Sequence, residues 1–359
     1  MKLTAQVKLL PSREQAKALR DTLEKANAAC NHISEVAWRE RIFGQFALHR
    51  LTYHCLRGQF GLSAQVIVRC IAKVADAYKL DRKSRRIFRP AGAISYDSRI
   101  LRWRLSSSEV SIWTVAGRQT IPFVCGDRQR ALLTTQQGES DLAVVEGKWY
   151  LFAVCNVEGP EPGDVGDFLG VDMGVANIAA DSDGRVYSGA VVNGLRHRHR
   201  RLRSKLQKKG TKSAKRLLRK RHSKESRFAR HENHCISKEI VAAAEGTKRG
   251  IALEELTGIR SRITARRPQR ATLSSWSFAQ LRSFIEYKAR RAGVTVIAVD
   301  PRNTSRTCPA CGYTDKANRP EQSIFSCVQC GFSGPADTIA AENIRRAAIR
   351  LPNAAGIYA

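Results

Sequence analysis

The chain has 359 residues, of which 62 are Lys or Arg and 32 are Asp or Glu, giving a net charge of +30 and an isoelectric point near 10.3. This length allows two or three domains with a real core, which excludes a small protein held together by disulfides. The excess of positive charge indicates a polyanionic partner, with nucleic acid as the leading candidate.

Two classes of protein are disfavoured by the distribution of apolar residues. No run of 18 apolar residues predicts a membrane span, and residues 1–7 lack the apolar core of a signal peptide. We therefore expect an intracellular protein with no membrane partner. In a reducing compartment, six scattered cysteines are interpreted as small buried hydrophobic residues: Cys30, Cys55, Cys70, Cys125, Cys155 and Cys235.

The N-terminal part predicts a strand followed by helices. Residues 1–10 alternate polar and apolar side chains, and Ser12 with Gln15 resembles a capping box. Apolar residues from Ala16 to Ala37 recur at spacings of three and four, as in an amphipathic helix, and a second helix from about Ser63 to Leu80 can pack against it. Their apolar positions are structural, and their basic outer faces are candidates for contact with nucleic acid.

Short alternating runs replace this helical pattern from about residue 87 to residue 157. Turn residues separate them at regular intervals, which predicts an antiparallel barrel or sandwich. The stretch from Glu158 to Asp164 is rich in Gly and Pro and is the clearest linker in the chain, so we expect a domain boundary there.

The second half predicts alternating strands and helices. An apolar run from Phe168 to Val175 is interpreted as a strand buried on both faces, and a turn at 181–184 joins two further strands. Later, Trp276 to Arg291 predicts an amphipathic helix and Val294 to Val299 a buried strand. This order fits an RNase H-like α/β fold. A Rossmann-type sheet is the alternative, disfavoured because no Gly-rich phosphate loop follows the first strand.

Between these elements lies the most basic stretch of the chain. Residues 196–230 contain 17 Lys or Arg and one acidic residue, Glu225, a net charge of +16. Apolar residues recur through it at roughly helical intervals, so we expect long helices with a basic surface for nucleic acid. The candidate contacts are Arg200, Arg201, Lys205, Lys208, Lys209, Lys212, Lys215, Arg216, Arg219 and Lys220.

Three carboxylates occupy comparable positions in the predicted elements. Asp172 lies in the buried run at 168–175, Glu254 ends the short apolar strand that begins at Ile251, and Asp337 opens a helix. An ionised carboxylate in an apolar strand is costly unless a metal or another partner stabilises it. Carboxylates in the order Asp, Glu, Asp are typical of a two-metal nuclease of the RNase H type when the first two end strands and the third begins a helix.

Four cysteines form two close pairs near the C-terminus. Cys308 and Cys311 precede Cys327 and Cys330 with the spacing C-x2-C-x15-C-x2-C, and a glycine follows each pair. This spacing predicts one tetrahedral zinc ion, which would be structural because all four positions are filled by sulfur. A redox-active dithiol is the alternative.

Taken together, these motifs resemble TnpB-type proteins, the transposon-encoded RNA-guided nucleases related to type V CRISPR effectors. The resemblance covers nearly the whole chain and rests on residues 170–175, 251–256, 304–312 and 337–344. Asp172, Glu254 and Asp337 match the family's catalytic carboxylates. Glu255 should point the other way on an extended strand. Many relatives read Asp-Arg-Asp-x-Asn around the last carboxylate, whereas here Asp337 follows Gly-Pro-Ala and Ile339 replaces the Asn.

The resemblance implies a multidomain layout. Residues 1–157 would form a wedge-like β-barrel with a helical recognition insert at about 12–86 that binds nucleic acid, and residues 158–167 a linker. Residues 168–306 and 332–359 would form an RNase H-like RuvC nuclease domain, with a zinc ribbon inserted at 307–331. The cofactors would be two catalytic Mg²⁺ ions, bound by the three carboxylates, and one structural Zn²⁺ ion.

The implied function is RNA-guided endonuclease cleavage. Guide RNA would select double-stranded target DNA beside a short adjacent motif, in a prokaryotic cytoplasm near the nucleoid. Two alternatives remain. One is an RNA-guided DNA-binding repressor that does not cut, which we would expect to lose one of the three carboxylates; the other is a transposase, which uses the same metal chemistry for strand transfer.

Overall fold

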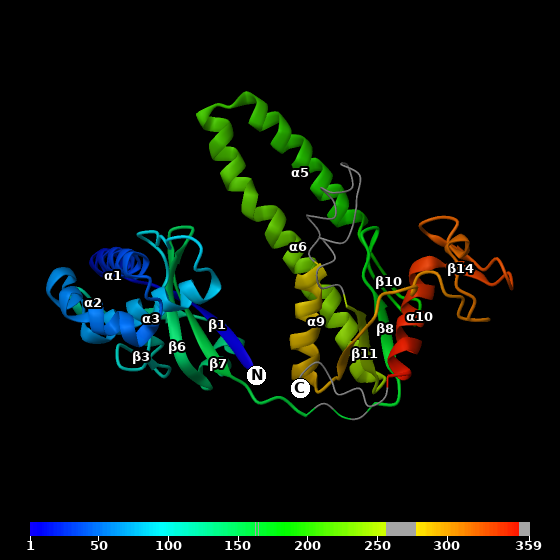
Figure 1. Cartoon of the computed structure of the whole chain (residues 1–359), viewed down its shortest axis with the longest axis horizontal. Coiled ribbons are helices and arrows are strands. Elements are labelled where there is room, and N and C mark those ends of the chain that lie inside the picture. The colour runs from blue at the N-terminus through cyan, green and yellow to red at the C-terminus, as the bar shows by residue number, and fades with distance from the viewer. Residues whose placement is uncertain (162, 164, 256–277, 352–359) are drawn as a thin grey trace. The chain divides into compact units, whose positions relative to one another are not determined.

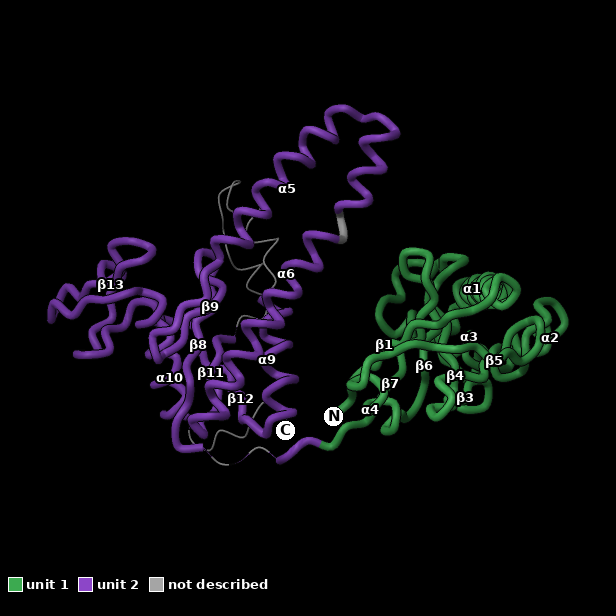
Figure 2. Tube along the Cα trace, turned by 180° about the vertical axis from the view of Figure 1, so that it is seen from behind, with its two compact units in different colours: residues 1–158 green, residues 159–359 purple. Residues whose placement is uncertain are grey.

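The computed structural model describes residues 1–161, 163, 165–255 and 278–351, with only the backbone of residues 222 and 223. It divides into two compact units, Met1–Glu158 and Gly159–Ala359, which Figure 2 shows in green and purple. The division falls within the predicted linker 158–167, of which residues 162 and 164 lie outside the described set. Trp276, the predicted start of a helix, lies outside it as well.

The first unit is built on a seven-stranded antiparallel sheet in the order β2-β6-β7-β1-β5-β4-β3. Its strands are β1 (Lys2–Leu9), β2 (Ile94–Tyr96), β3 (Leu101–Arg104), β4 (Glu109–Thr114), β5 (Gly117–Val124), β6 (Gln136–Val145) and β7 (Lys148–Asn156). Residues 97–100 connect the edge strands β2 and β3, so the joined ends are at most about 18 Å apart. A flat sheet would separate these edges by about 29 Å, six spacings of about 4.8 Å. The sheet is therefore nearly closed, and the predicted antiparallel β-structure is confirmed.

Three helices follow β1 in the first unit, where the sequence predicted two. They are α1 (Arg13–Glu40), α2 (Gln45–Phe60) and α3 (Ala64–Leu80), and the short α4 (Asp127–Leu133) lies between β5 and β6. The capping box is confirmed, because the Ser12 and Gln15 side chains accept hydrogen bonds from each other's backbone N–H groups. The missed helix α2 buries Leu48, Thr52 and Leu56 but leaves Phe46 exposed, so its apolar stripe is weak.

The second unit contains a five-stranded mixed sheet in the order β10-β9-β8-β11-β12. Its strands are β8 (Phe168–Asp172), β9 (Asn177–Asp181), β10 (Val186–Ser188), β11 (Gly250–Glu254) and β12 (Val296–Val299). β9 runs antiparallel to both of its neighbours, β8 and β10, whereas β11 runs parallel to β8 and β12 runs parallel to β11. The antiparallel hairpins exclude the Rossmann-type alternative, whose strands would be mostly parallel.

Helices cover both faces of this sheet, as Figure 1 shows. Leu169 and Val171 of β8 pack in a core with apolar residues of α6 (Lys212–Gly246) and α9 (Phe278–Ala292). Phe168 faces the opposite way, toward Ile344 of α10 (Ala336–Ile349). At Gly170 the helix comes so close that a Cβ atom would lie 2.0 Å from the carbonyl oxygen of Ala341. Glycine is therefore required for α10 to lie against β8.

Two excursions leave the sheet of the second unit. The predicted basic helices are confirmed as α5 (Ala190–Lys209) and α6, a long hairpin extending away from the strands (Figure 1). The cysteine-bearing segment lies between β12 and α10 and includes η1 (Lys316–Asn318) and a small antiparallel hairpin, β13 (Ile324–Ser326) with β14 (Ser333–Pro335). Gly312 and Gly331 have φ angles of 78° and 74°, which explains the glycine after each cysteine pair.

The six scattered cysteines correct one prediction in part. Cys30, Cys70 and Cys155 are buried as expected, and Cys125 is half-buried, but Cys55 and Cys235 are exposed. Both exposed cysteines lie on helix surfaces, Cys55 on α2 and Cys235 on α6, where a small side chain is tolerated without burial. No helix within the described residues is long and apolar enough to cross a membrane.

Candidate active site and cysteine cluster

The sheet places two of the predicted carboxylates at neighbouring strand ends. β8 and β11 are parallel, with Val171 paired to Leu253, so Asp172 and Glu254 follow at the same level. Asp337 is the second residue of α10, the helix that packs directly against β8. Side chains at the carboxyl ends of adjacent parallel strands converge on one edge of the sheet. The three carboxylates thus come from separate segments and meet beside β8.

Electrostatics show that these carboxylates interact with one another. The pKa of Asp172 is raised to about 7 by burial and by the nearby charges of Glu254 and Asp337, against the opposing charge of Arg319. The pKa of Glu254 is also raised by burial, against a hydrogen bond from Thr304 and the charge of Arg319. Crowded carboxylates in a partly buried site favour binding of a cation.

Neighbouring side chains orient two members of the triad. The hydroxyl of Thr304 donates a hydrogen bond to Glu254 Oε1 at 2.5 Å, and Asn177 Nδ2 donates to Asp337 Oδ2 at 2.8 Å. Asn177 is the first residue of β9 and therefore supports Asp337 from the sheet. Neither donor was predicted from the sequence, because nothing local to Asn177 or Thr304 indicates its distant partner.

Arg319 connects the cysteine-bearing segment to the carboxylates. It lies between the two cysteine pairs, and its Nη2 atom is 3.5 Å from Asp337 Oδ1 and 2.7 Å from the carbonyl oxygen of Gln322. Its guanidinium also opposes the upward pKa shifts of Asp172 and Glu254. Arg319 was not predicted as a site residue, because it is one arginine among many in a basic chain.

Glu255 is engaged elsewhere. Its two carboxylate oxygens accept hydrogen bonds from Nη1 and Nη2 of Arg282 on α9, each at 3.0 Å. Arg282 also donates to Glu286 one turn further along the same helix. The two adjacent acids at the end of β11 therefore have different partners. Glu254 lies with the other two predicted carboxylates, and Glu255 is bound by Arg282 of α9.

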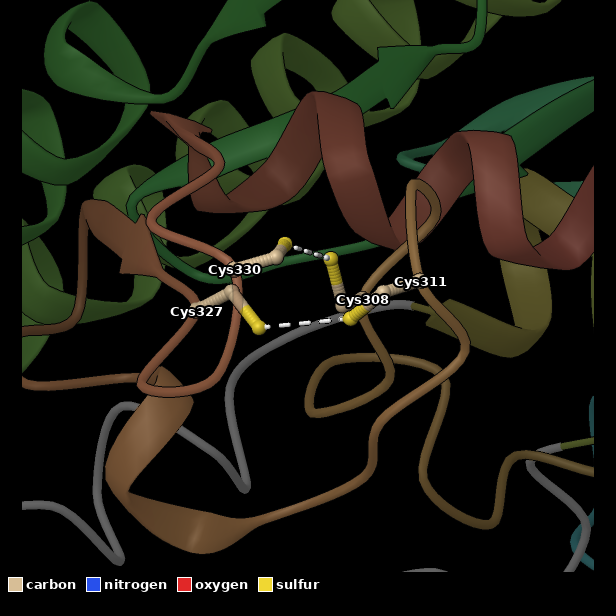
Figure 3. Close-up of side chains that lie close together, drawn as sticks. All are labelled: Cys308, Cys311, Cys327 and Cys330. Carbon is tan, nitrogen blue, oxygen red and sulfur yellow. Dashed lines mark hydrogen bonds between the residues drawn. The ribbon is translucent and has the colours of Figure 1, made fainter.

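The four paired cysteines form a compact cluster, shown in Figure 3. All four sulfur atoms lie within 4.8 Å of one another, with 3.6 Å from Cys308 Sγ to Cys330 Sγ and from Cys311 Sγ to Cys327 Sγ. Four sulfurs around one zinc, with bonds of about 2.3 Å, would be separated by about 3.8 Å at tetrahedral angles. The cluster therefore has the dimensions to hold a metal ion.

The segment around the cluster is tied together by a buried asparagine. The Nδ2 group of Asn318 donates to the carbonyl oxygens of Arg306 and Tyr313, and its Oδ1 accepts from the backbone N–H of Val328. These bonds link the two cysteine-bearing turns.

The three carboxylates are more widely spread than the four thiols. Among the described residues, only the four cysteines bring three or more ligand atoms of His, Cys, Asp or Glu within 4.8 Å of one another.

The ten predicted nucleic-acid contacts are all exposed on the hairpin of α5 and α6. This placement leaves their charges accessible to a polyanion. Arg219 also lines a groove between the two helices. Their contact with nucleic acid stays a prediction.

The fold resembles that of solved Cas12-type effectors. The chain in a structure described as a Cas12f1–sgRNA–target DNA complex aligns with a TM-score of 0.62 at 18% identity, covering 94% of this chain and 83% of that one. The mini-RNA-guided endonuclease CRISPR-Cas phi3 aligns with a TM-score of 0.59 at 11% identity, covering 97% and 92%. The fold of this chain is thus similar to the folds of these two solved structures.

Sequence comparisons identify more specific relatives. The family model "Probable transposase" matches residues 152–256, and "Cas12f1-like, TNB domain" matches residues 278–344. The endodeoxyribonuclease Cas12f1 of Syntrophomonas palmitatica is 31% identical over 207 residues, covering 52% of this chain and 40% of the relative. A TnpB-like protein of Methanocaldococcus jannaschii is 34% identical over 146 residues, covering 40% and 52%. The chain thus spans about half or less of the length of these relatives. The resemblance to TnpB-type proteins related to type V effectors is confirmed.

Proposed function

We propose that this chain is an RNA-guided DNA endonuclease. The observation that carries the proposal is the convergence of Asp172, Glu254 and Asp337 from β8, β11 and α10. The strand order, with three antiparallel strands and two further strands parallel to the first, supports an RNase H-like RuvC domain around this triad. Relatives that are named as endodeoxyribonucleases support the same reaction class.

The three carboxylates would hold two Mg²⁺ ions. Their oxygen ligands suit a hard cation, and the raised pKa of Asp172 indicates a site whose negative charge is incompletely compensated by the protein. When bound, the two ions would supply an activated water and stabilise the leaving 3′ oxygen, leaving a 5′ phosphate. Thr304 would fix Glu254, and Asn177 would fix Asp337, before metal and substrate bind.

Arg319 has a different role in this proposal. Its guanidinium is next to the carboxylates and can form charge-assisted hydrogen bonds with a phosphate group. The four cysteines would bind one structural zinc ion, which leaves no open ligand position for catalysis. The zinc ribbon would thereby hold Arg319 beside the triad.

Nucleic-acid partners follow from the charge and the relatives. The exposed basic residues of α5 and α6 would contact guide RNA or its duplex with target DNA, and base pairing would supply the sequence specificity. The first unit, as a wedge-like barrel with helical insert, would bind nucleic acid and read a short motif beside the target. A prokaryotic cytoplasmic location is consistent with this role.

The proposal is tested by changing the guide. The protein is purified with its RNA, the guide segment of about 20 nucleotides is replaced, and cut positions are mapped on plasmid DNA. Cuts should follow the new guide and disappear in Asp172→Asn, a control of nearly the same size that removes a metal-binding charge. Cuts that ignore the guide would indicate a general nuclease or a transposase. Guide-dependent binding without any cutting would indicate the repressor alternative.

A further inference from the structure

A groove of about 300 Å³ lies between α5 and α6. Its apolar lining comes from Leu202 and Leu206 on α5 and Leu218 on α6, and these leucines are only half-buried. The volume lies at the lower end of ligand-binding pockets, which suits a group the size of one ring system rather than a protein segment. The groove therefore offers apolar surface within the most basic part of the chain.

Mainly positively charged side chains surround this apolar surface. Arg203, Arg219 and Arg221 line the groove together with Glu225, the single acid among residues 196–230. Glu225 accepts a hydrogen bond from Arg203 at 2.8 Å, which engages its negative charge. The remaining charge of the hairpin is strongly positive, so an anionic ligand is favoured over a cationic or neutral one.

Arg221 provides a hydrogen-bond donor to such a ligand. Its Nε–H is buried and has no acceptor within the described part of the chain. Buried donors are normally paired, so the Arg221 side chain, which also lines the groove, gains a partner if it turns toward an acceptor such as a phosphate oxygen. His199 and Gln207 add a ring for stacking and an amide for the edge of a base.

We infer that the groove binds one unstacked nucleotide of a single strand, with its base against the leucines and its phosphate on the arginines. A nucleotide combines a flat apolar ring with an attached anion, which is the combination that this groove presents. The inference rests on the proposed function, because it assigns a contact to the nucleic acid of that function. RNA and single-stranded DNA share this chemistry.

The test separates the base from the phosphate. Binding of the full-length protein is measured by fluorescence anisotropy for oligothymidine and for an abasic strand, both of about 20 nucleotides, at one salt concentration. The abasic strand keeps every phosphate, so the affinity ratio reports on the bases. Wild type should prefer the base-bearing strand by about fivefold or more. In Leu218→Ala, which removes apolar surface under the base, this ratio should fall toward one. Arg221→Gln, which removes a phosphate contact, should weaken both strands and keep their ratio.

Lys208→Gln is the matched control. Lys208 is exposed on α5 outside the groove, so this variant loses one charge, as Arg221→Gln does. It should leave the ratio unchanged and weaken both strands less than Arg221→Gln does, because its charge lies outside the groove. Circular dichroism verifies the helix content of each variant. If Leu218→Ala disturbs the hairpin, Arg221→Gln still tests the groove, because it leaves the apolar surface in place.

The outcomes show whether the nucleotide belongs to RNA or to DNA, and whether the inference holds. A larger loss for oligouridine than for oligothymidine in the groove variants assigns the nucleotide to RNA, the reverse assigns it to DNA, and equal losses show that either strand is accepted. A ratio near one in wild type, an unchanged ratio in Leu218→Ala, or a loss of affinity for Arg221→Gln no larger than that for Lys208→Gln overturns the inference. Because binding is measured without cleavage, failure of guided cutting would leave this result intact.

Discussion

Asn177→Ala tests whether the hydrogen bond to Asp337 positions the proposed metal site. The variant removes a donor 2.8 Å from Asp337 Oδ2, while Arg319 stays 3.5 Å from the other carboxylate oxygen. A hydrogen bond to a charged group is worth about 1.5–3 kcal/mol. If that energy supports the transition state, cleavage should slow by about 10- to 150-fold. Asn177→Asp should be worse, because it replaces the donor with a second negative charge beside Asp337.

The assay is the single-turnover cleavage rate of guide-loaded protein as a function of Mg²⁺ concentration. A positioning role predicts that half-saturation moves to higher Mg²⁺, because Asp337 must be reoriented when metal binds. Asn193→Ala is the matched control: Asn193 donates to the carbonyl oxygen of Val175 at 2.9 Å and belongs to the same unit without contacting the triad. An unchanged rate and Mg²⁺ dependence in Asn177→Ala, or losses equal to those of Asn193→Ala, would refute the reasoning.

Three further predictions concern the cysteines, the triad and the sheet. Cys308→Ser should lower the zinc content, measured by elemental analysis, from about one ion per chain. The control Cys55→Ser, at an exposed cysteine outside the cluster, should keep that content. Native protein that is fully active without zinc would contradict the predicted zinc ribbon. Alanine at each proposed metal-binding carboxylate should abolish cleavage and preserve guide-dependent DNA binding in a gel-shift assay, while Glu255→Gln should be much milder because Glu255 contacts α9. Gly170→Ala should lower stability to thermal unfolding by about 1–3 kcal/mol or more, since its Cβ would meet backbone of α10. Gly194→Ala, in helix α5 with open space around it, should stabilise by about 0.5–1 kcal/mol, and equal melting temperatures for the two variants would argue against the packing of α10 on β8.

Elements whose residues carry a strong local pattern were predicted well. The apolar run from Phe168 to Val175 contains β8, which ends at Asp172, because burial on both faces leaves little alternative for so many apolar residues. Ser12 and Gln15 predicted a helix start because a capping box is made by residues three apart. The cysteine cluster was also predictable from local spacing, because two tight turns are enough to bring four thiols together.

Features that depend on distant partners could not be predicted in the same way. Asn177 and Asp337 are 160 positions apart, and Thr304 and Glu254 are 50 apart. Their pairing requires the packing of α10 and the path of the chain after β12, which no local spacing encodes. Helix α2 was missed for a related reason: tertiary contacts bury Leu48 and Leu56, while Phe46 on the same helix stays exposed.

The order of synthesis has a consequence for the proposed nuclease. Asp172 emerges from the ribosome long before Asp337, and α10 is the last helix that the structure describes. At about 5–20 residues per second, the first unit can complete its fold roughly 10–35 seconds before the third carboxylate is made. A nascent chain that already presents basic helices to RNA would therefore still lack its complete metal site. Under the proposed function, assembly with guide RNA would begin before the chain has the carboxylates needed to cut DNA.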